Sequence, residues 1–182
     1  GAAGTLLSVG NALKDLGHEI DYLWKIEEPY QSSKGSFQIL FELPKRQYAQ
    51  VAAQLKQKTY DVVSISQPFA YLVYEKLTRQ YPQTLFLNRT HGWEARVNQA
   101  YFQFGWDDRS SLSQSLWKRW RASQINHFCK RTLRACQGFI APNRRCAGFI
   151  KDQGIDSEKL TIIPYGIPEE FLGLPSRTQP EG

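Results

Sequence analysis

Apolar side chains recur at helical spacing over residues 6–16, and polar and apolar side chains alternate over residues 18–24. The first pattern predicts a helix that follows a small-residue loop at 1–4 and ends at Gly17, and the second predicts a strand. A loop, a helix and a strand in this order form the second half of a βαβ unit. We therefore expect the first strand of that unit to precede Gly1.

The middle of the chain continues to alternate between strands and helices. Residues 37–43 predict a short strand, and Pro44 is expected to open a helix. That helix would bury Tyr48, Val51 and Leu55. The next predicted elements are a buried parallel strand at 61–66, a helix at 70–81 that Pro82 stops, and a strand at 84–87.

Residues 112–135 favour a helix, but a single apolar face does not run through it. The sector that holds Leu116 and Trp120 lies more than a quarter-circle away from the sector that holds Phe128 and Leu133. We expect either two helical pieces or a kink near 122–124, with the two halves packing against different surfaces.

The last third of the chain completes an α/β pattern. Alternating strands and helices predict a doubly wound, mostly parallel Rossmann-like sheet with helices on both faces. One domain over residues 1–172 is expected, and loops 25–35 and 98–111 carry no recognisable motif. The final predicted elements are a strand at 138–141, a helix at 144–153 closed by Gly154, a strand at 160–163, an exit segment at 164–172 and a linker at 173–182.

Length and composition place limits on the class of protein. The 182 residues suit one α/β domain with an apolar core, and no apolar run approaches the roughly 20 residues of a membrane span. The chain contains no Met and opens on small residues, so we interpret it as a piece of a longer protein. Cys129, Cys136 and Cys146 match no zinc spacing with His127, which indicates free thiols in a reducing compartment and no metal.

The positive charge is concentrated in one region. Ten Lys and Arg and no Asp or Glu lie between Arg109 and Lys151, whereas the remainder holds 13 basic and 17 acidic residues. This region indicates contact with an anionic ligand, a membrane surface or nucleic acid, or else a solvated helix face. No recognised nucleic-acid motif accompanies it, so no nucleic-acid partner is expected. The interleaved side chains suited to a membrane or an acceptor are Trp117, Lys118, Trp120 and Arg121.

Polar and charged residues follow the strand at 84–87 directly. His91 is the candidate catalytic residue of this strand-to-loop junction, since ligands of α/β proteins bind at the carboxyl ends of strands. The alternative is a loop histidine that is only hydrogen-bonded. The neighbouring candidates for substrate binding are Asn88, Arg89, Gly92 and Glu94.

The glycines at the start of the chain are a second candidate site. Gly1 and Gly4 would let a phosphate approach the amino terminus of a helix, although glycines in such turns also serve the turn itself. The chain has no G-x-S-x-G elbow, no H-E-x-x-H and no complete P-loop, which argues against a hydrolase or a metalloprotease.

Four stretches in order resemble the amino-terminal domain of a GT-B glycosyltransferase of family four. They are the glycine-containing opening at 1–4 with LGHEI at 16–20, NRTHG at 88–92, RACQGFIAPN at 134–143, and the run from 154 to 171 that contains KLTIIPYGIPEEF. The resemblance covers nearly the whole chain, and its last stretch is the most specific. The sequence departs from the family pattern at Cys136, Gln137, Asn143 and Tyr165, where Ala, Asp, Ser and Asn are usual.

The resemblance implies a function for each matching stretch. The amino-terminal domain would bind the acceptor, Gly1 and Gly4 would lie beside the donor diphosphate, and His91 would contact the donor sugar. A nucleotide-sugar would be a co-substrate, with no cofactor and no metal, and transfer would retain the anomeric configuration. The donor-binding domain would follow Pro175, so this fragment is expected to be inactive alone. The expected location is cytoplasmic, with peripheral attachment to the inner membrane face as an added possibility. The alternative is a non-catalytic Rossmann-like module that binds an anionic ligand, a membrane surface or a partner protein.

Overall fold

The computed structural model describes residues 2–23, 36–65, 70–90 and 112–166, and the chain divides into two compact units. One unit combines Gly1–Tyr22 with Pro164–Gly182, and the other is Leu23–Ile163. The predicted linker at 173–182 and the loops at 25–35 and 98–111 lie outside the described residues.

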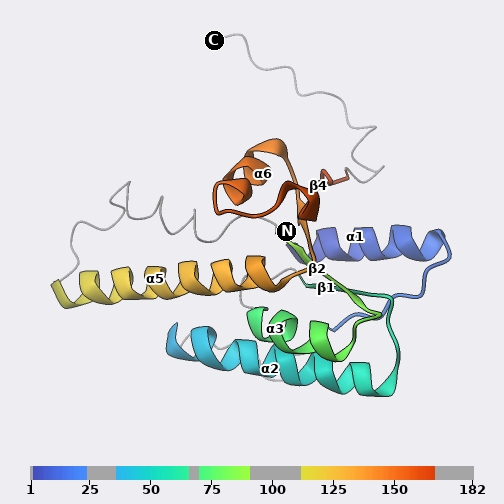
Figure 1. Ribbon diagram of the computed structural model, residues 1–182, viewed down its shortest axis with the longest axis horizontal. Helices are drawn as coiled ribbons and strands as arrows, with labels where there is room; N and C mark the ends of the chain where they lie inside the picture. Colours follow the sequence, from blue (N-terminus) through green and yellow to red (C-terminus); the bar gives the residue numbers. More distant parts are fainter. Residues whose placement is uncertain (1, 24–35, 66–69, 91–111, 167–182) are drawn as a thin grey trace, which may run out of the picture. The chain divides into compact units, whose positions relative to one another are not determined.

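A parallel four-stranded sheet is the centre of the larger unit (Figure 1). Its strands lie in the order β1-β2-β3-β4, so each strand pairs with the next one along the chain. This arrangement confirms the α/β, Rossmann-like class. A doubly wound sheet also needs a reversal of strand order, and the described strands contain none. The strands are β1 (Val62–Ile65), β2 (Leu85–Arg89), β3 (Gly138–Ala141) and β4 (Leu160–Ile162).

Helices cover one face of this sheet. Side chains from α3, α5 and α6 share a buried cluster with Phe86 and Phe139, which point from the sheet toward the helices. The helix α3 contacts both α2 and α5, which makes a layer of three helices. The helices of this unit are α2 (Ser36–Gln57), α3 (Tyr71–Gln80), α5 (Leu112–Ala135) and α6 (Arg144–Lys151), with a 3-10 turn at Ser157–Lys159.

The opposite face of the sheet carries exposed apolar side chains. Val62 and Leu85 are paired neighbours on this face, and they are 48% and 43% exposed. Further along it, Leu87 extends over Gly138, where a Cβ atom would stand 2.7 Å from its Cδ2. Glycine at 138 therefore provides room for Leu87 at the β2–β3 pair.

The smaller unit is built on α1 (Ala2–Asp15). Gly17 ends this helix at a φ of 87°, with hydrogen bonds from Gly17 N to Lys14 O and from His18 N to Leu13 O. This is a Schellman motif, so the prediction for Gly17 is confirmed. The chain then turns back, and the Tyr22 ring lies against Gly10 and beneath Lys14.

Three predictions about the first half of the chain are wrong. Gly4 lies inside α1 rather than in a loop, because the helix already begins at Ala2 and alanines favour helix. Residues 18–23 form no strand, since Tyr22 packs on α1 instead of pairing with a neighbouring strand. Residues 37–43 belong to α2, which continues through Pro44. Leu40, 1% exposed, stands four residues before Pro44 and extends the buried face by one turn.

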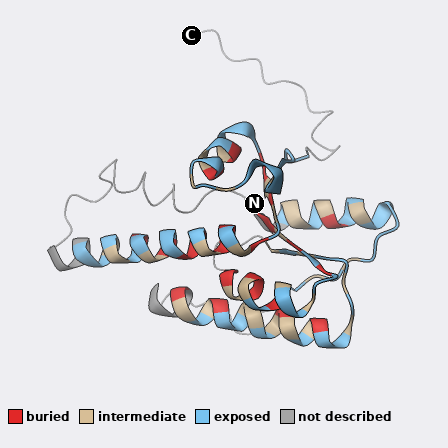
Figure 2. Cartoon of the chain, viewed as in Figure 1, coloured by how far each residue is buried: buried red, intermediate tan, exposed pale blue. Residues whose placement is uncertain are grey.

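The predicted break in the long helix is also wrong. One unbroken helix, α5, spans 24 residues, and the change of apolar face reflects what each half contacts. Ala122, Ile125 and Leu133 are buried against the rest of the unit, whereas exposed positions predominate in the amino-terminal half (Figure 2). Among the described residues, no helix is long and apolar enough to cross a bilayer.

We expect Phe128→Ala to destabilise the larger unit by about 3–4 kcal/mol, since this side chain is 4% exposed and stacks on Tyr71. Urea unfolding followed by far-UV circular dichroism measures the loss. Leu85→Ala is the control, because a side chain 43% exposed should cost less than about 1 kcal/mol. Equal losses in the two variants would contradict the assigned core.

Candidate functional site

The carboxyl edge of the parallel sheet is the candidate site, because all four strands end there. Pairing continues one residue past two of the strands. Thr90 N donates to Ile140 O at 3.2 Å, and Ile163 N donates to Ala141 O at 2.9 Å. The residue that follows each of these strands is therefore fixed in register with its neighbour, which gives the edge a defined backbone.

Arg89 and Thr90 form the stem of the predicted catalytic loop. Both residues are 6% exposed at the end of β2. His91, Gly92 and Glu94 lie outside the described residues, as does Gly1. The described backbone ends here at Thr90, which is hydrogen-bonded to β3.

Asn88 lies beneath this edge, on the face that packs against the helices. Its side chain is 3% exposed, and its Nδ2 donates to the hydroxyl of Tyr74 at 3.1 Å. That hydroxyl donates in turn to Leu87 O at 2.9 Å. Burial raises the pKa of Tyr74 well above its usual value. These hydrogen bonds join Tyr74 of α3 to Leu87 and Asn88 near the carboxyl end of β2. They therefore fix the end of the strand that precedes His91 in the sequence.

Positive charge gathers where β3 reaches the same edge. Asn143 follows this strand and caps α6, with its Oδ1 accepting from Cys146 N at 2.8 Å. Arg144 and Arg145 lie exposed in the first turn of α6. A helix amino terminus carries partial positive charge, and the two guanidinium groups add to it. This part of the edge is therefore electropositive and suited to an anion.

The other predicted residues that the structure describes belong to α1 and α5. Gly4 is exposed in the first turn of α1, in the smaller unit, where helix N–H groups have no acceptor in the preceding turn. Trp117 is 46% exposed on α5 and stacks on half-buried Trp120 with 4.7 Å between ring centroids. Lys118 is half-buried and Arg121 is exposed on the same helix.

No metal centre is formed by the described part of the chain, where no three His, Cys, Asp or Glu side chains gather. His127 is exposed and packs edge-on against Phe128. Cys129 and Cys136 are buried and Cys146 is half-buried, and none of the three is in a disulfide. Cys129 and Cys136 belong to the buried apolar cluster, and Cys146 packs against it.

Comparison with known proteins gives the family. The model of Glycosyltransferase Family 4 matches residues 1–171. The chain belongs to glycosyltransferase family 4. Searches of curated proteins and of solved structures found no match. A family 4 domain acts on a sugar donor and an acceptor, and the carboxyl edge of the sheet is where such ligands would bind in this architecture.

Three departures from the family pattern have local structural explanations. The Sγ of Cys136 donates to Leu133 O at 3.4 Å in a buried site. Gln137 Oε1 accepts from Phe86 N at 2.8 Å, which ties the start of β3 to β2. Asn143 caps α6, as a serine could. The sequence analysis did not predict the roles of Tyr74, Gln137 and the Arg144–Arg145 pair. For the arginine pair a signal was available, because Asn143 is a helix-capping residue that directly follows a predicted strand.

Burial raises the pKa of Cys136 from 9.0 to about 12, so the unfolded chain ionises this thiol first. The free energy of unfolding should not depend on this thiol well below pH 9, where it is protonated in both states. It should fall by roughly 4 kcal/mol as pH rises from 9 toward 12, because only the unfolded chain then loses the proton. Urea unfolding at a series of rising pH values measures this decline. Cys136→Ala should flatten it, whereas parallel curves for parent and variant would refute the assignment.

Proposed function

We propose that this chain is the acceptor-side half of a retaining, nucleotide-sugar-dependent glycosyltransferase of the GT-B type. One observation carries the proposal: the family 4 match spans the parallel sheet whose β2 ends at Arg89, two residues before His91. In the proposed enzyme His91 contacts the donor sugar, and Asn88, Arg89, Gly92 and Glu94 support that loop.

The donor phosphate position is proposed at the start of α1. Gly4 has no side chain to obstruct a close approach to the first turn of that helix, and nothing lies within 4 Å of the place a Cβ would take. The N–H groups at the amino terminus of a helix point outward and can donate hydrogen bonds to an anion that binds there. Together with Gly1, this turn would lie beside the donor diphosphate, with neither a metal nor a cofactor needed to hold it.

The other half of the reaction requires a donor-binding domain. We infer that a nucleotide-sugar binds such a domain and that the transferred sugar keeps its anomeric configuration. The fragment alone should then show no transfer. A cytoplasmic setting is supported by Cys136 and Cys146, whose side chains are in no disulfide, since reducing compartments keep cysteines reduced.

Fusing a family 4 donor domain after Pro175 tests the proposal, with nucleotide release as the assay and NMR of the product anomer as the readout for retention. The fusion should transfer sugar, and His91→Ala should lower kcat/KM by about a hundredfold. His18→Ala is the matched control, because this histidine is exposed beyond α1 and should leave turnover unchanged.

Unchanged turnover in His91→Ala would remove the role proposed for this residue. Binding of an anionic ligand by a fusion that shows no transfer would instead favour a non-catalytic Rossmann-like module. The exposed Arg144 and Arg145 at the carboxyl edge are the observation that supports this second function.

A further inference from the structure

We propose that the exposed side of α5 binds an anionic membrane surface, with Leu116 and Trp117 entering the interfacial layer and the cations of the helix meeting lipid phosphates. This inference goes beyond sugar transfer and does not depend on it. One exposed side of α5 is hereafter called the α5 stripe and consists of Leu116, Arg119, Ser123, His127, Lys130 and Arg134. The exposed ring of Trp117 borders this stripe, about 100° round the helix from Leu116.

The stripe follows helical geometry. Leu116, Arg119 and Ser123 are separated by three and four residues, so they share one side of the helix, and Lys130 and Arg134 continue it. The side chains of Ala122, Ile125 and Cys129 occupy the opposite, buried side. The sequence of α5 contains no Asp or Glu. The charged residues on the outward side of this helix are therefore all cationic, and Leu116 and Trp117 form an apolar group near its amino-terminal end.

The apolar group is large for a water-exposed position. Leu116 is 67% exposed and Trp117 is 46% exposed, which leaves both side chains in contact with solvent. Burying apolar area removes it from water and is favourable. Adjacent exposed apolar side chains bordered by charge mark an interaction surface more often than isolated ones do.

The Trp117 ring is held in place by a series of aromatic contacts. It stacks on Trp120, which lies 6.3 Å from the ring of Phe41 in α2, and Phe41 packs edge-on against buried Phe128 at 5.8 Å. Trp120 is thus an anchor within the unit rather than a contact residue. Since the outer indole is already supported, it loses little conformational freedom on binding.

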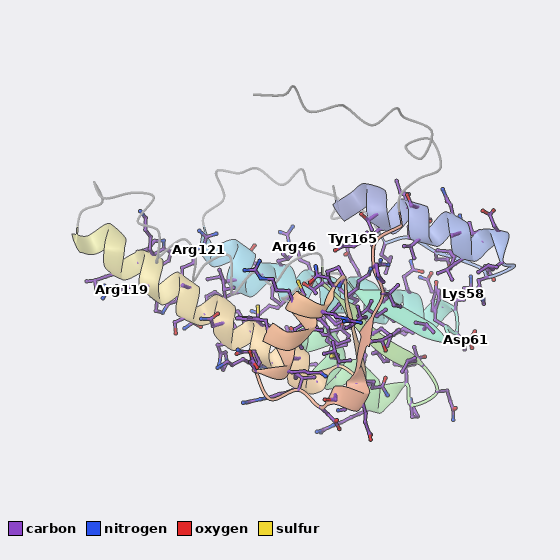
Figure 3. All side chains as sticks on the ribbon, turned by 90° about the horizontal axis from the view of Figure 1, so that it is seen from above. Arg46, Lys58, Asp61, Arg119, Arg121 and Tyr165 are labelled. Atoms are coloured by element: carbon purple, nitrogen blue, oxygen red, sulfur yellow. The ribbon has the colours of Figure 1, made fainter. Side chains whose placement is uncertain are left out.

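A bilayer surface matches this combination better than a nucleic acid does. Anionic headgroups attract Arg and Lys, while the interface beneath them accepts Trp and Leu. A nucleic acid offers phosphates to the cations but no matching environment for Leu116. Figure 3 shows Arg119 and Arg121 on the amino-terminal half of α5, close in sequence to the exposed apolar pair.

The direction of α5 gives the surface a defined place in the unit. Because α5 ends at Ala135 just before the start of β3, its amino terminus points toward the carboxyl edge of the sheet. A helix of 24 residues is roughly 36 Å long, whereas the five residues of β2 extend roughly 17 Å. The amino-terminal end of α5 reaches beyond α2 and α3 (Figure 1).

Co-sedimentation of the 182-residue chain with vesicles tests the proposal directly. The chain should sediment with phosphatidylcholine vesicles that contain phosphatidylglycerol and much less with phosphatidylcholine alone. Arg119→Gln should weaken binding about fivefold, the contribution of one cation at an anionic surface. Leu116→Ser should weaken it about tenfold through lost apolar contact.

Two controls match these changes elsewhere in the chain. Arg79→Gln removes an exposed arginine from α3, and Leu16→Ser removes a leucine that is 75% exposed after α1. Both should bind as the parent does. Far-UV circular dichroism of all four variants verifies that a loss of binding is not a loss of fold.

Quenching by brominated lipid locates the inserted residue. Brominated vesicles should quench the fluorescence of the parent, and Trp117→Phe should bind equally while losing most of that quenching. Absent binding to anionic vesicles, or binding that Leu116→Ser and Arg119→Gln leave intact, would overturn the proposal. Binding to a random DNA duplex that Arg119→Gln weakens, without vesicle binding, would assign the stripe to nucleic acid instead.

Discussion

The packing of Phe128 is the interaction on which the helical layer depends. Its ring stacks on Tyr71 of α3 at 4.8 Å and meets Phe41 of α2 edge-on, so one side chain of α5 fixes the other two helices. On the far side of Tyr71 lies the guanidinium of Arg131, 4.0 Å from the ring centroid and paired with Glu75. Aromatic area of this kind dominates core energetics, and the ion pair closes its solvent side at modest cost because it remains partly hydrated.

Sequence patterns predicted the elements of the larger unit well where the apolar spacing within an element matches the residues that the fold buries. Strands at 61–66, 84–87 and 138–141 and the helix ended by Pro82 could be read from local apolar spacing, because the sheet and its helical layer bury the same residues. The prediction failed where spacing allowed two answers. The short apolar stretch at 37–43 predicts a strand, but Leu40 aligns with the later buried positions of α2, and burial on that helix decides in favour of a helix.

The candidate site was predictable in position but not in composition. A strand that ends before Arg89 and His91 indicates a ligand edge, and the parallel sheet places Thr90 and Asn143 there. Successive side chains of a strand point to opposite faces of the sheet, so the face of each polar residue depends on where the strand starts. It also depends on hydrogen-bond partners that lie far away in the sequence. Asn88 is an example: its neighbours in the sequence look like a polar loop, yet its amide is committed to Tyr74. Likewise Gln137 completes the backbone bonding of Phe86, a role that only the register of β2 and β3 reveals.

The sequential strand order carries a consequence for how the protein is made. Because β1, β2, β3 and β4 pair in the order in which they are synthesised, every new strand can join an existing edge as soon as its own helix has formed. Among the strands that the structure describes, none has to be inserted between two that are already paired. The connection from β2 to β3 is long, since it runs from Arg89 to Gly138 and includes the whole of α5. Parallel pairing across such a separation is slow, so the edge of β2 stays exposed to other chains until β3 joins it. The strand order therefore allows pairing to proceed in chain order from β1 to β4, with the β2–β3 pair as its slowest step.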